Sequence, residues 1–194
     1  MRSRPSGPSA GEGGLRVFGI DPGSRFCGFG VVEPAGGGGL RHLAHGVLAL
    51  GEGPVELRLL ALHQGLQREL GAHRPQLVVI EDVFSKHARS ALVLGQARGV
   101  ALLAAAQSGA EVRSFPPATI KQLVTGSGRA EKGQVGRMVS MLLGITIEER
   151  VDASDALAAA ICGLLSAHRP VLPIPSPRSA RTAEVLRLLK ARRR

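Results

Sequence analysis

A change of hydrophobic period in the first half of the chain most constrains its fold. From Val55 to Leu70 apolar residues recur at intervals of three or four, which lays one apolar stripe along a helix that Pro75 closes. Four consecutive apolar residues follow at 77–80. A short apolar run after such a helix is typical of a buried strand that lies parallel to a strand already in the sheet. The sequence therefore predicts an α/β protein.

Three apolar stretches precede that helix. Residues 15–20 and 26–32 flank Pro22 and Gly23, a turn signal, so we expect two antiparallel strands joined by a short connection. Residues 40–50 are expected to add a third strand to this meander. The predicted fold class is a mixed five-stranded sheet with helices on both faces. Its remaining elements are expected as a helix at 90–108, a strand at 111–115, and helices at 117–124, 130–143 and 152–167.

The length of 194 residues fits one domain with two tails. We expect an amino-terminal extension at 1–14, a folded domain at 15–167 and a Pro-rich, basic tail at 168–194. That tail carries eight Lys and Arg and one Glu, so it holds most of the formal net charge of +10. A basic balance favours a polyanionic partner such as nucleic acid, or an acidic membrane surface. The tail itself is interpreted equally well as a solvated arm or as a phosphate-binding arm.

The two cysteines favour a reduced compartment. Cys27 and Cys162 have no CxxC spacing and no second ligand pair, which makes a structural zinc site an unsuitable interpretation. No segment offers the uninterrupted apolar span of a membrane helix. We therefore expect a soluble, cytoplasmic protein without membrane contact.

Acidic residues stand where predicted elements begin or end. Asp21 and Glu81 each follow an apolar run, and functional groups of mixed α/β sheets gather where strands end. If the two strands are neighbours, the two carboxylates repel each other unless a cation or a proton intervenes. Asp152 and Asp155 share one face at a helix start. Four carboxylates without His or Cys partners suit a hard cation such as Mg²⁺ or Mn²⁺.

Each acid also has a structural interpretation without a metal. Asp21 followed by Pro and Gly fits simple turn chemistry. Glu81 could end a strand in solvent. Asp152 and Asp155 fit the N-cap and N3 positions of the following helix, where a carboxylate stabilises by about 0.5 to 2 kcal/mol. The co-occurrence of all four at three element boundaries favours the metal site.

Five ordered blocks cover most of residues 17–161 and read GIDPGSRFCGFGVV, VVIEDVF, SALVLGQARGVALLAAA, GRAEKGQVGRMV and VDASDALAAAI. In this order the blocks resemble the RuvC family of Holliday-junction resolvases. The resemblance implies a ribonuclease H-like fold, a homodimer, and symmetric nicking of four-way DNA junctions with Mg²⁺ or Mn²⁺. It also implies that a branch-migration helicase complex is a partner.

The resemblance carries roles onto matching positions. The acidic tetrad of the family matches Asp21, Glu81, Asp152 and Asp155, and two basic residues associated with DNA and the active site match Lys121 and Lys132. Two ions about 3.5 to 4 Å apart would serve phosphodiester hydrolysis, and our hypothesis places Asp21 between them. Lys132 is the candidate for steadying the scissile phosphate. A stacking phenylalanine matches Phe84, with Lys86 and Arg89 as further candidate DNA contacts.

Several alternatives stay open. Phe84 is as well explained by a core position as by a platform for an unstacked base. The small-residue helix at 91–106, with Gly95 and Gly99, suggests close approach either to its own sheet or to a second subunit. A nuclease acting on RNA would use the same carboxylate chemistry. A junction-binding protein without catalysis is less compatible, because four uncompensated carboxylates would weaken phosphate binding.

Overall fold

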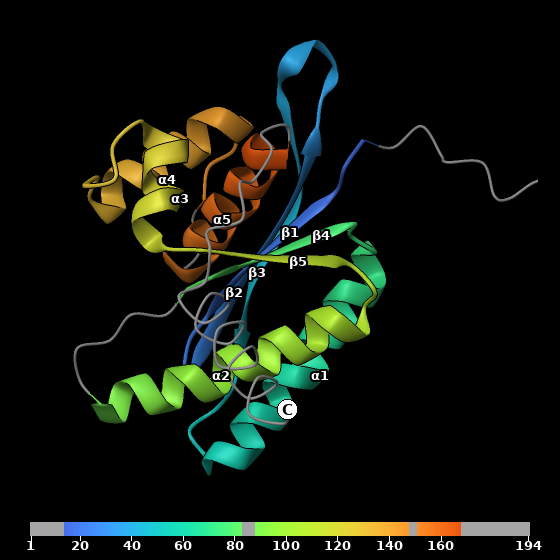
Figure 1. Ribbon diagram of the computed structural model, residues 1–194, viewed down its shortest axis with the longest axis vertical. Coiled ribbons are helices and arrows are strands. Elements are labelled where there is room, and N and C mark those ends of the chain that lie inside the picture. The colour runs from blue at the N-terminus through green and yellow to red at the C-terminus, as the bar shows by residue number, and fades with distance from the viewer. Residues whose placement is uncertain (1–13, 83–87, 148–150, 168–194) are drawn as a thin grey trace, which may run out of the picture.

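The described chain is one mixed sheet between two layers of helices (Figure 1). The computed structural model describes residues 14–82, 88–147 and 151–167. The sheet order is β3-β2-β1-β4-β5, which confirms the predicted five-stranded sheet with helices on both faces. The strands are β1 (Val17–Pro22), β2 (Phe26–Pro34), β3 (Leu40–Ala49), β4 (Leu77–Glu81) and β5 (Glu111–Phe115). The helices are α1 (Val55–His73), α2 (Ala88–Gln107), α3 (Pro117–Thr125), α4 (Lys132–Leu143) and α5 (Val151–Ala167).

The first three strands form the predicted antiparallel meander. Strand β1 runs further than the sequence indicated, because Asp21 and Pro22 still pair with Gly28 and Cys27 of β2. Asp21 is therefore a residue of the strand, and the interpretation of it as simple turn chemistry is wrong. Proline is tolerated at this position because it stands at the last residue of the strand, where the ladder ends.

Strands β4 and β5 extend the sheet in parallel, as a strand that follows a helix is expected to do. The register of β1 and β4 aligns Ile20 with Ile80. The next residues are Asp21 and Glu81, so the parallel pairing brings these two acids to the same edge of the sheet. Glu81 itself pairs with Phe115 of β5, so it lies within the ladder and not beyond it in solvent.

Helix α5 lies unusually close to the middle of the sheet. A Cβ on Gly19 would come within 2.0 Å of the Ala156 carbonyl oxygen, and one on Gly28 within 1.9 Å of the Asp152 carbonyl oxygen. Only glycine permits this approach, because the atoms in the way are backbone. The contact at Gly28 places the first turn of α5 beside the end of β1, where Asp21 pairs with Gly28.

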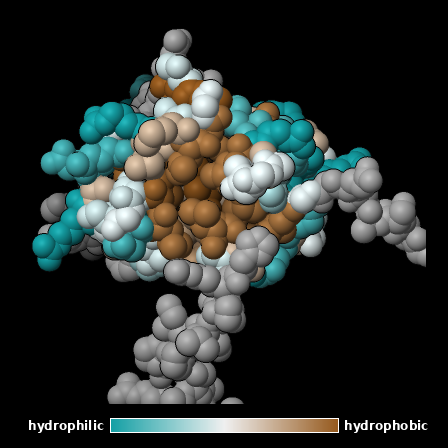
Figure 2. All heavy atoms as spheres, turned by 90° about the horizontal axis from the view of Figure 1, so that it is seen from above, coloured by the Kyte–Doolittle hydropathy of each residue, from teal (hydrophilic) through white to brown (hydrophobic). Residues whose placement is uncertain are grey.

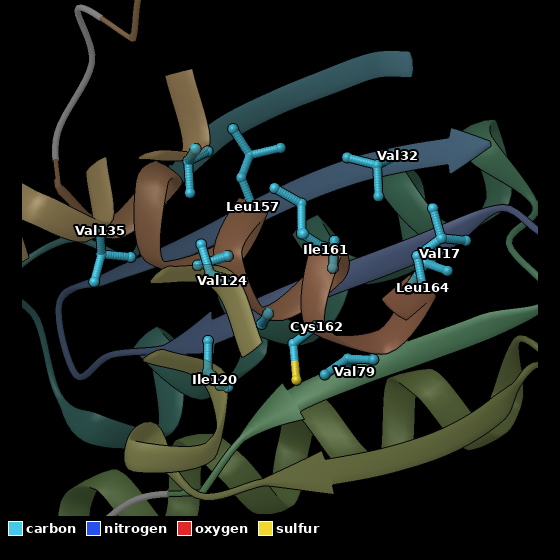
Figure 3. Packing of buried hydrophobic residues seen from close by; sticks show 14 of the residues in the cluster. Val17, Val32, Val79, Ile120, Val124, Val135, Leu157, Ile161, Cys162 and Leu164 are labelled. Carbon is cyan, nitrogen blue, oxygen red and sulfur yellow. The ribbon is translucent and has the colours of Figure 1, made fainter. Parts of the chain in front are cut away.

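Two apolar clusters cover the two faces of the sheet. Helices α1 and α2 bury Phe18, Ile20 and Phe29 on one face. On the other face, strand residues such as Val17, Val32 and Val79 meet α3, α4 and α5 (Figure 3). Apolar side chains also reach the surface at the end of the molecule seen in Figure 2. The exposed leucines and methionine of α4 and α5 are Met141, Leu142 and Leu165.

A buried acid ties the opposite end of the sheet together. Glu33 is 2% exposed and accepts hydrogen bonds from Arg16 of the segment before β1 and from Arg41 of β3. Burial alone would raise the pKa of Glu33, but the hydrogen bonds from Arg41 and Arg16 outweigh it and hold this pKa below its usual value. Arg16 also donates to the His73 carbonyl oxygen at 2.7 Å, which attaches the end of α1.

Cys27 and Cys162 are both buried and unbonded to each other. Within the described residues, no helix has both the length and the apolar character that crossing a membrane requires.

Candidate active site

A cleft of about 420 Å³ opens where β1 and β4 end and helices α3, α4 and α5 come together. Its polar lining combines acids and lysines, and its walls are apolar. The parallel strands supply Asp21 and Glu81, α5 supplies Asp155, and α3 and α4 supply one lysine each. The lining residues are Asp21, Pro22, Gly23, Glu81, Asp82, Leu94, Pro117, Ile120, Lys121, Lys132, Val135, Asp155 and Ala158.

The two strand acids are perturbed by their surroundings. Burial, followed by the charges of Asp155 and Asp152, raises the pKa of Asp21 to about 7, and Lys132 opposes this rise. Burial, followed by the charges of Asp21 and Asp155, raises the pKa of Glu81 to about 7 as well. Both carboxyls therefore resist ionisation in a place that gathers several negative charges.

Helix α5 contributes the other two predicted acids. Asp155 lines the cleft, and its Oδ2 accepts a hydrogen bond from Lys132 Nζ at 3.0 Å. Asp152 lies in the first turn of α5 and is not the N-cap, because the helix begins at Val151. Its side chain is not among those lining the cleft, but its charge acts on Asp21. The structure thus brings three of the four acids into one cleft and the fourth to its border.

Two lysines balance part of this charge. Lys132 is the first residue of α4, and its hydrogen bond to Asp155 is the largest cause of the rise in its pKa. Lys121 of α3 lines the same cleft and acts to lower the pKa of Glu81. Cations on one side and acids on the other can hold a phosphodiester near a bound metal ion.

Asp82 also lines the cleft, but its role differs from that of Glu81. It accepts a hydrogen bond from Arg98 of α2 at 2.6 Å, and Arg98 also donates to Ser114 Oγ of β5 at 2.8 Å. Asp82 is therefore neutralised by its partner, and it fastens α2 to the ends of β4 and β5. Its neighbour Glu81 has no such arginine among the described residues.

The donor set fits a hard divalent cation. All four predicted ligands are carboxylates, and their mutual repulsion is what a divalent ion relieves. Among the described residues, no three His, Cys, Asp or Glu side chains stand as a ready-made metal site. Asp155 is turned toward Lys132, so closing around an ion requires side-chain rotation. The chemistry of the donors therefore fits a hard divalent cation.

The remaining predicted DNA contacts lie beyond the part of the chain that the structure describes. Phe84 and Lys86 lie outside the described residues, as does the side chain of Arg89. Sequence reasoning missed the apolar walls of the cleft, among them Leu94 and Val135. Nothing in the sequence distinguishes a core residue from one at a cleft wall.

Comparison with known proteins gives a consistent result. Residues 17–163 match the family model described as crossover junction endodeoxyribonuclease RuvC. The protein of that name from Alkalilimnicola ehrlichii is 49% identical over 150 residues, which cover 77% of this chain and 90% of that protein. The one from Myxococcus xanthus is 51% identical over 157 residues, covering 77% and 80%. The structure of Thermus thermophilus RuvC in complex with a Holliday junction substrate superposes with a TM-score of 0.73 at 33% identity, covering 79% of this chain and 94% of that one.

Proposed function

This chain belongs to the RuvC family of crossover junction endodeoxyribonucleases, and we propose that it resolves four-way DNA junctions by paired, symmetric, metal-dependent nicks. The observation that carries this proposal is the cleft in which Asp21 and Glu81, from adjacent parallel strands, meet Asp155 beside two lysines. Burial and neighbouring carboxylates raise the pKa values of Asp21 and Glu81, and a bound cation would relieve this repulsion.

The proposed ligands of the divalent cations are Asp21, Glu81, Asp152 and Asp155. When bound, such ions lower the pKa of a water and stabilise charge on the attacking and leaving oxygens. If Asp155 turned to an ion, Lys132 would lose this partner and be available to a phosphate oxygen. Lys121, on the opposite helix of the cleft, is placed to hold the same strand. Mg²⁺ is the proposed ion, and Mn²⁺ the substitute.

The test uses three substrates with and without Mg²⁺: a synthetic four-way junction, a linear duplex and an RNA/DNA hybrid. Paired nicks confined to the junction and dependent on metal are expected. Cleavage of the hybrid in preference to the junction would make the protein a nuclease of RNA. Junction binding without any cleavage would make it a non-catalytic binding protein.

A matched pair of variants examines the acids. Asp21→Asn should abolish nicking and leave junction binding intact, because it removes the central carboxylate and adds no bulk. Asp82→Asn changes the neighbouring cleft acid, which is already paired with Arg98, and should keep cleavage while lowering the melting temperature. Retained cleavage by Asp21→Asn at saturating Mg²⁺ contradicts the assignment.

The proposal includes a homodimer formed through α2. One face of this helix buries Ala97, Ala101 and Ala104 against its own fold. The glycines that suggested close approach lie elsewhere: a Cβ on Gly95 or Gly99 would meet nothing within 4 Å in the described chain. Close approach to the sheet therefore does not explain them, and a second copy remains as the explanation.

Two exposed leucines support the proposal that the same face of α2 forms the dimer interface. Leu92 is 65% exposed and Leu103 is 52% exposed, at helical spacing with Gly95 and Gly99. Leu103→Glu should give a monomer by sedimentation at micromolar concentration. Met141→Glu, which also charges an exposed apolar residue but on α4, should leave the dimer intact. A wild-type protein that sediments as a monomer would remove this part of the proposal.

A further inference from the structure

A second cleft adjoins the catalytic one, between α4 and the start of α5. Helices α4 and α5 cover the same face of the sheet (Figure 1). Its volume is about 430 Å³, and it shares Lys132 with the catalytic cleft. Among the described residues that line it, two are cationic and none is acidic. The lining consists of Lys132, Gly133, Gly136, Arg137, Ser140, Ile147 and Ser154.

The Ser154 side chain brings a hydroxyl group to this cleft. Ser154 is only 8% exposed, and its hydroxyl makes no hydrogen bond to any group of the described chain. Its Oγ lies 3.4 Å from the position that a Cβ on Gly136 would take, so it faces α4 across the cleft. The other buried hydroxyl of α5, on Ser166, donates to the Gly163 carbonyl oxygen at 3.0 Å. Ser154 Oγ is not among the described buried atoms that lack a partner, so it is open to water in the cleft, where it can donate to an oxygen-rich ligand.

Arg137 brings a positive charge to the same place. It is exposed and forms no ion pair with any described residue. Its Nη1 lies 3.6 Å from the position of a Cβ on Gly133, so the guanidinium extends over the surface between these residues. A cation and a hydroxyl donor on opposite sides of a cleft suit a phosphate oxygen.

We propose that this cleft holds a backbone phosphate of the cleaved DNA strand, one or two nucleotides from the scissile phosphate, with Arg137 and Ser154 as its contacts. The inference rests on the proposed function. Arg137 lies about 7.5 Å along the axis of α4 from Lys132, since a helix rises about 1.5 Å per residue. A DNA strand rises about 3.4 Å per nucleotide along the duplex axis and its phosphates lie further apart than this, so the separation corresponds to one or two nucleotides.

The proposed path of the DNA strand also explains why residue 133 is a glycine. Glycine within a helix costs about 1 kcal/mol relative to alanine, and the protein leaves ordinary van der Waals room for a methyl group there. Packing within the described chain therefore does not require glycine at this position. A DNA backbone that passes close to α4 does.

The experiment measures the affinity of the full chain for a synthetic four-way junction in a chelator, over a range of salt concentrations. Ser154→Ala should weaken binding about tenfold without changing its salt dependence, because it removes an uncharged donor to a charged group. Arg137→Gln should weaken binding and lower the slope of log affinity against log salt by about one, as the loss of one phosphate contact does. Gly133→Ala should weaken binding while the melting temperature stays the same or rises.

The controls make the same chemical changes elsewhere. Ser166→Ala removes a buried hydroxyl at the other end of α5, and Arg68→Gln removes an exposed charge from α1 on the opposite face of the sheet. Both should bind the junction as the wild type does. Because Gly133→Ala is not expected to destabilise the fold, a loss of affinity in that variant cannot be assigned to unfolding.

Two outcomes overturn the inference. If the wild type cuts the junction and the Ser154, Arg137 and Gly133 variants bind it unchanged, the cleft is not a strand site and the proposed function stands. If inorganic phosphate raises the melting temperature only when Ser154 and Arg137 are present, while junction affinity is unaffected by their loss, the cleft is a site for a free anion. A wild type that neither binds nor cuts the junction removes the proposed function and this inference together.

Discussion

Neutralising Asp21 should stabilise the protein while it abolishes activity. Burial and the charges of Asp155 and Asp152 raise the pKa of this carboxyl from 3.8 to about 7. Each tenfold change in proton affinity corresponds to about 1.4 kcal/mol, so ionised Asp21 could cost the fold at most about 4 kcal/mol. The carboxyl lines a cleft open to water and shares its repulsion with Glu81 and Asp155, which reduces the expected gain of Asp21→Asn to about 1 to 2 kcal/mol. For a domain of this size, that is a rise in melting temperature of about 2 to 8 °C.

The pH dependence identifies the cause. Above about pH 7 the carboxyl is ionised in both the folded and the unfolded chain, and the penalty is fully present. As the pH falls through the folded pKa of about 7 toward 3.8, the folded wild type takes up a proton that the unfolded chain does not bind. Its stability therefore approaches that of Asp21→Asn. The gain should be largest near pH 8.5 and small near pH 5.

The assay is thermal unfolding in a chelator at these two pH values, repeated with Mg²⁺. Mg²⁺ should raise the melting temperature of the wild type, because a ligand of the folded state stabilises it, and should have much less effect on Asp21→Asn. Glu52→Gln is the control, since the Glu52 side chain is 84% exposed and an exposed ion pair contributes little. A melting temperature of Asp21→Asn below that of the wild type at pH 8.5, or a gain of equal size at pH 5, would refute the reasoning.

Three further predictions concern the scaffold. Glu33→Gln should lower the free energy of unfolding by about 2 kcal/mol near neutral pH, because Arg16 and Arg41 lose a buried carboxylate. The difference should shrink below pH 4.5, where the pKa of unfolded glutamate lies, and equal urea midpoints for the two proteins would contradict this. Gly19→Ala should lose at least about 2 kcal/mol, because its Cβ would stand 2.0 Å from the Ala156 carbonyl oxygen, whereas Gly71→Ala should be neutral or stabilising. Cys27 should react with a disulfide reagent only on unfolding, because burial and the nearby acids Asp21 and Asp152 raise the pKa of its thiol; fast labelling of the folded chain would count against the burial shown here.

The elements and most of their ends follow from local patterns. The strand at 111–115 was predicted with its observed bounds, and the helices were predicted to within two residues at each end. Strand β1 continues two residues beyond its predicted end, through Pro22. A proline followed by glycine signals a turn locally, but the pairing with β2 decides where the strand ends, and that pairing is made by residues on the other side of the turn.

The site was predictable where it depends on strand order and unpredictable where it depends on distant partners. Asp21 and Glu81 meet because parallel strands end at the same edge, an expectation available from the sequence. By contrast, the pairing of Asp82 with Arg98, 16 residues away in the chain, becomes visible only in the folded structure. The burial of Glu33 was missed for the same reason, since Arg16 lies 17 residues away in the chain. Charge alone does not say which acids are compensated.

The positions of the acids in the site depend on the packing of the core. The carbonyl oxygen of Asp152 lies against Gly28, and Gly28 is the strand partner of Asp21, so the distance between these two acids is set by how closely α5 packs on the sheet. A side chain at Gly28 would displace the first turn of α5 and with it Asp152 and Asp155. The fold thus holds together carboxylates that repel one another, and the stability for this comes from the apolar cluster beneath α5. A variant that weakens the packing of α5 should therefore lower metal affinity and the melting temperature together, because α5 packs on the middle of the sheet and not at its edge.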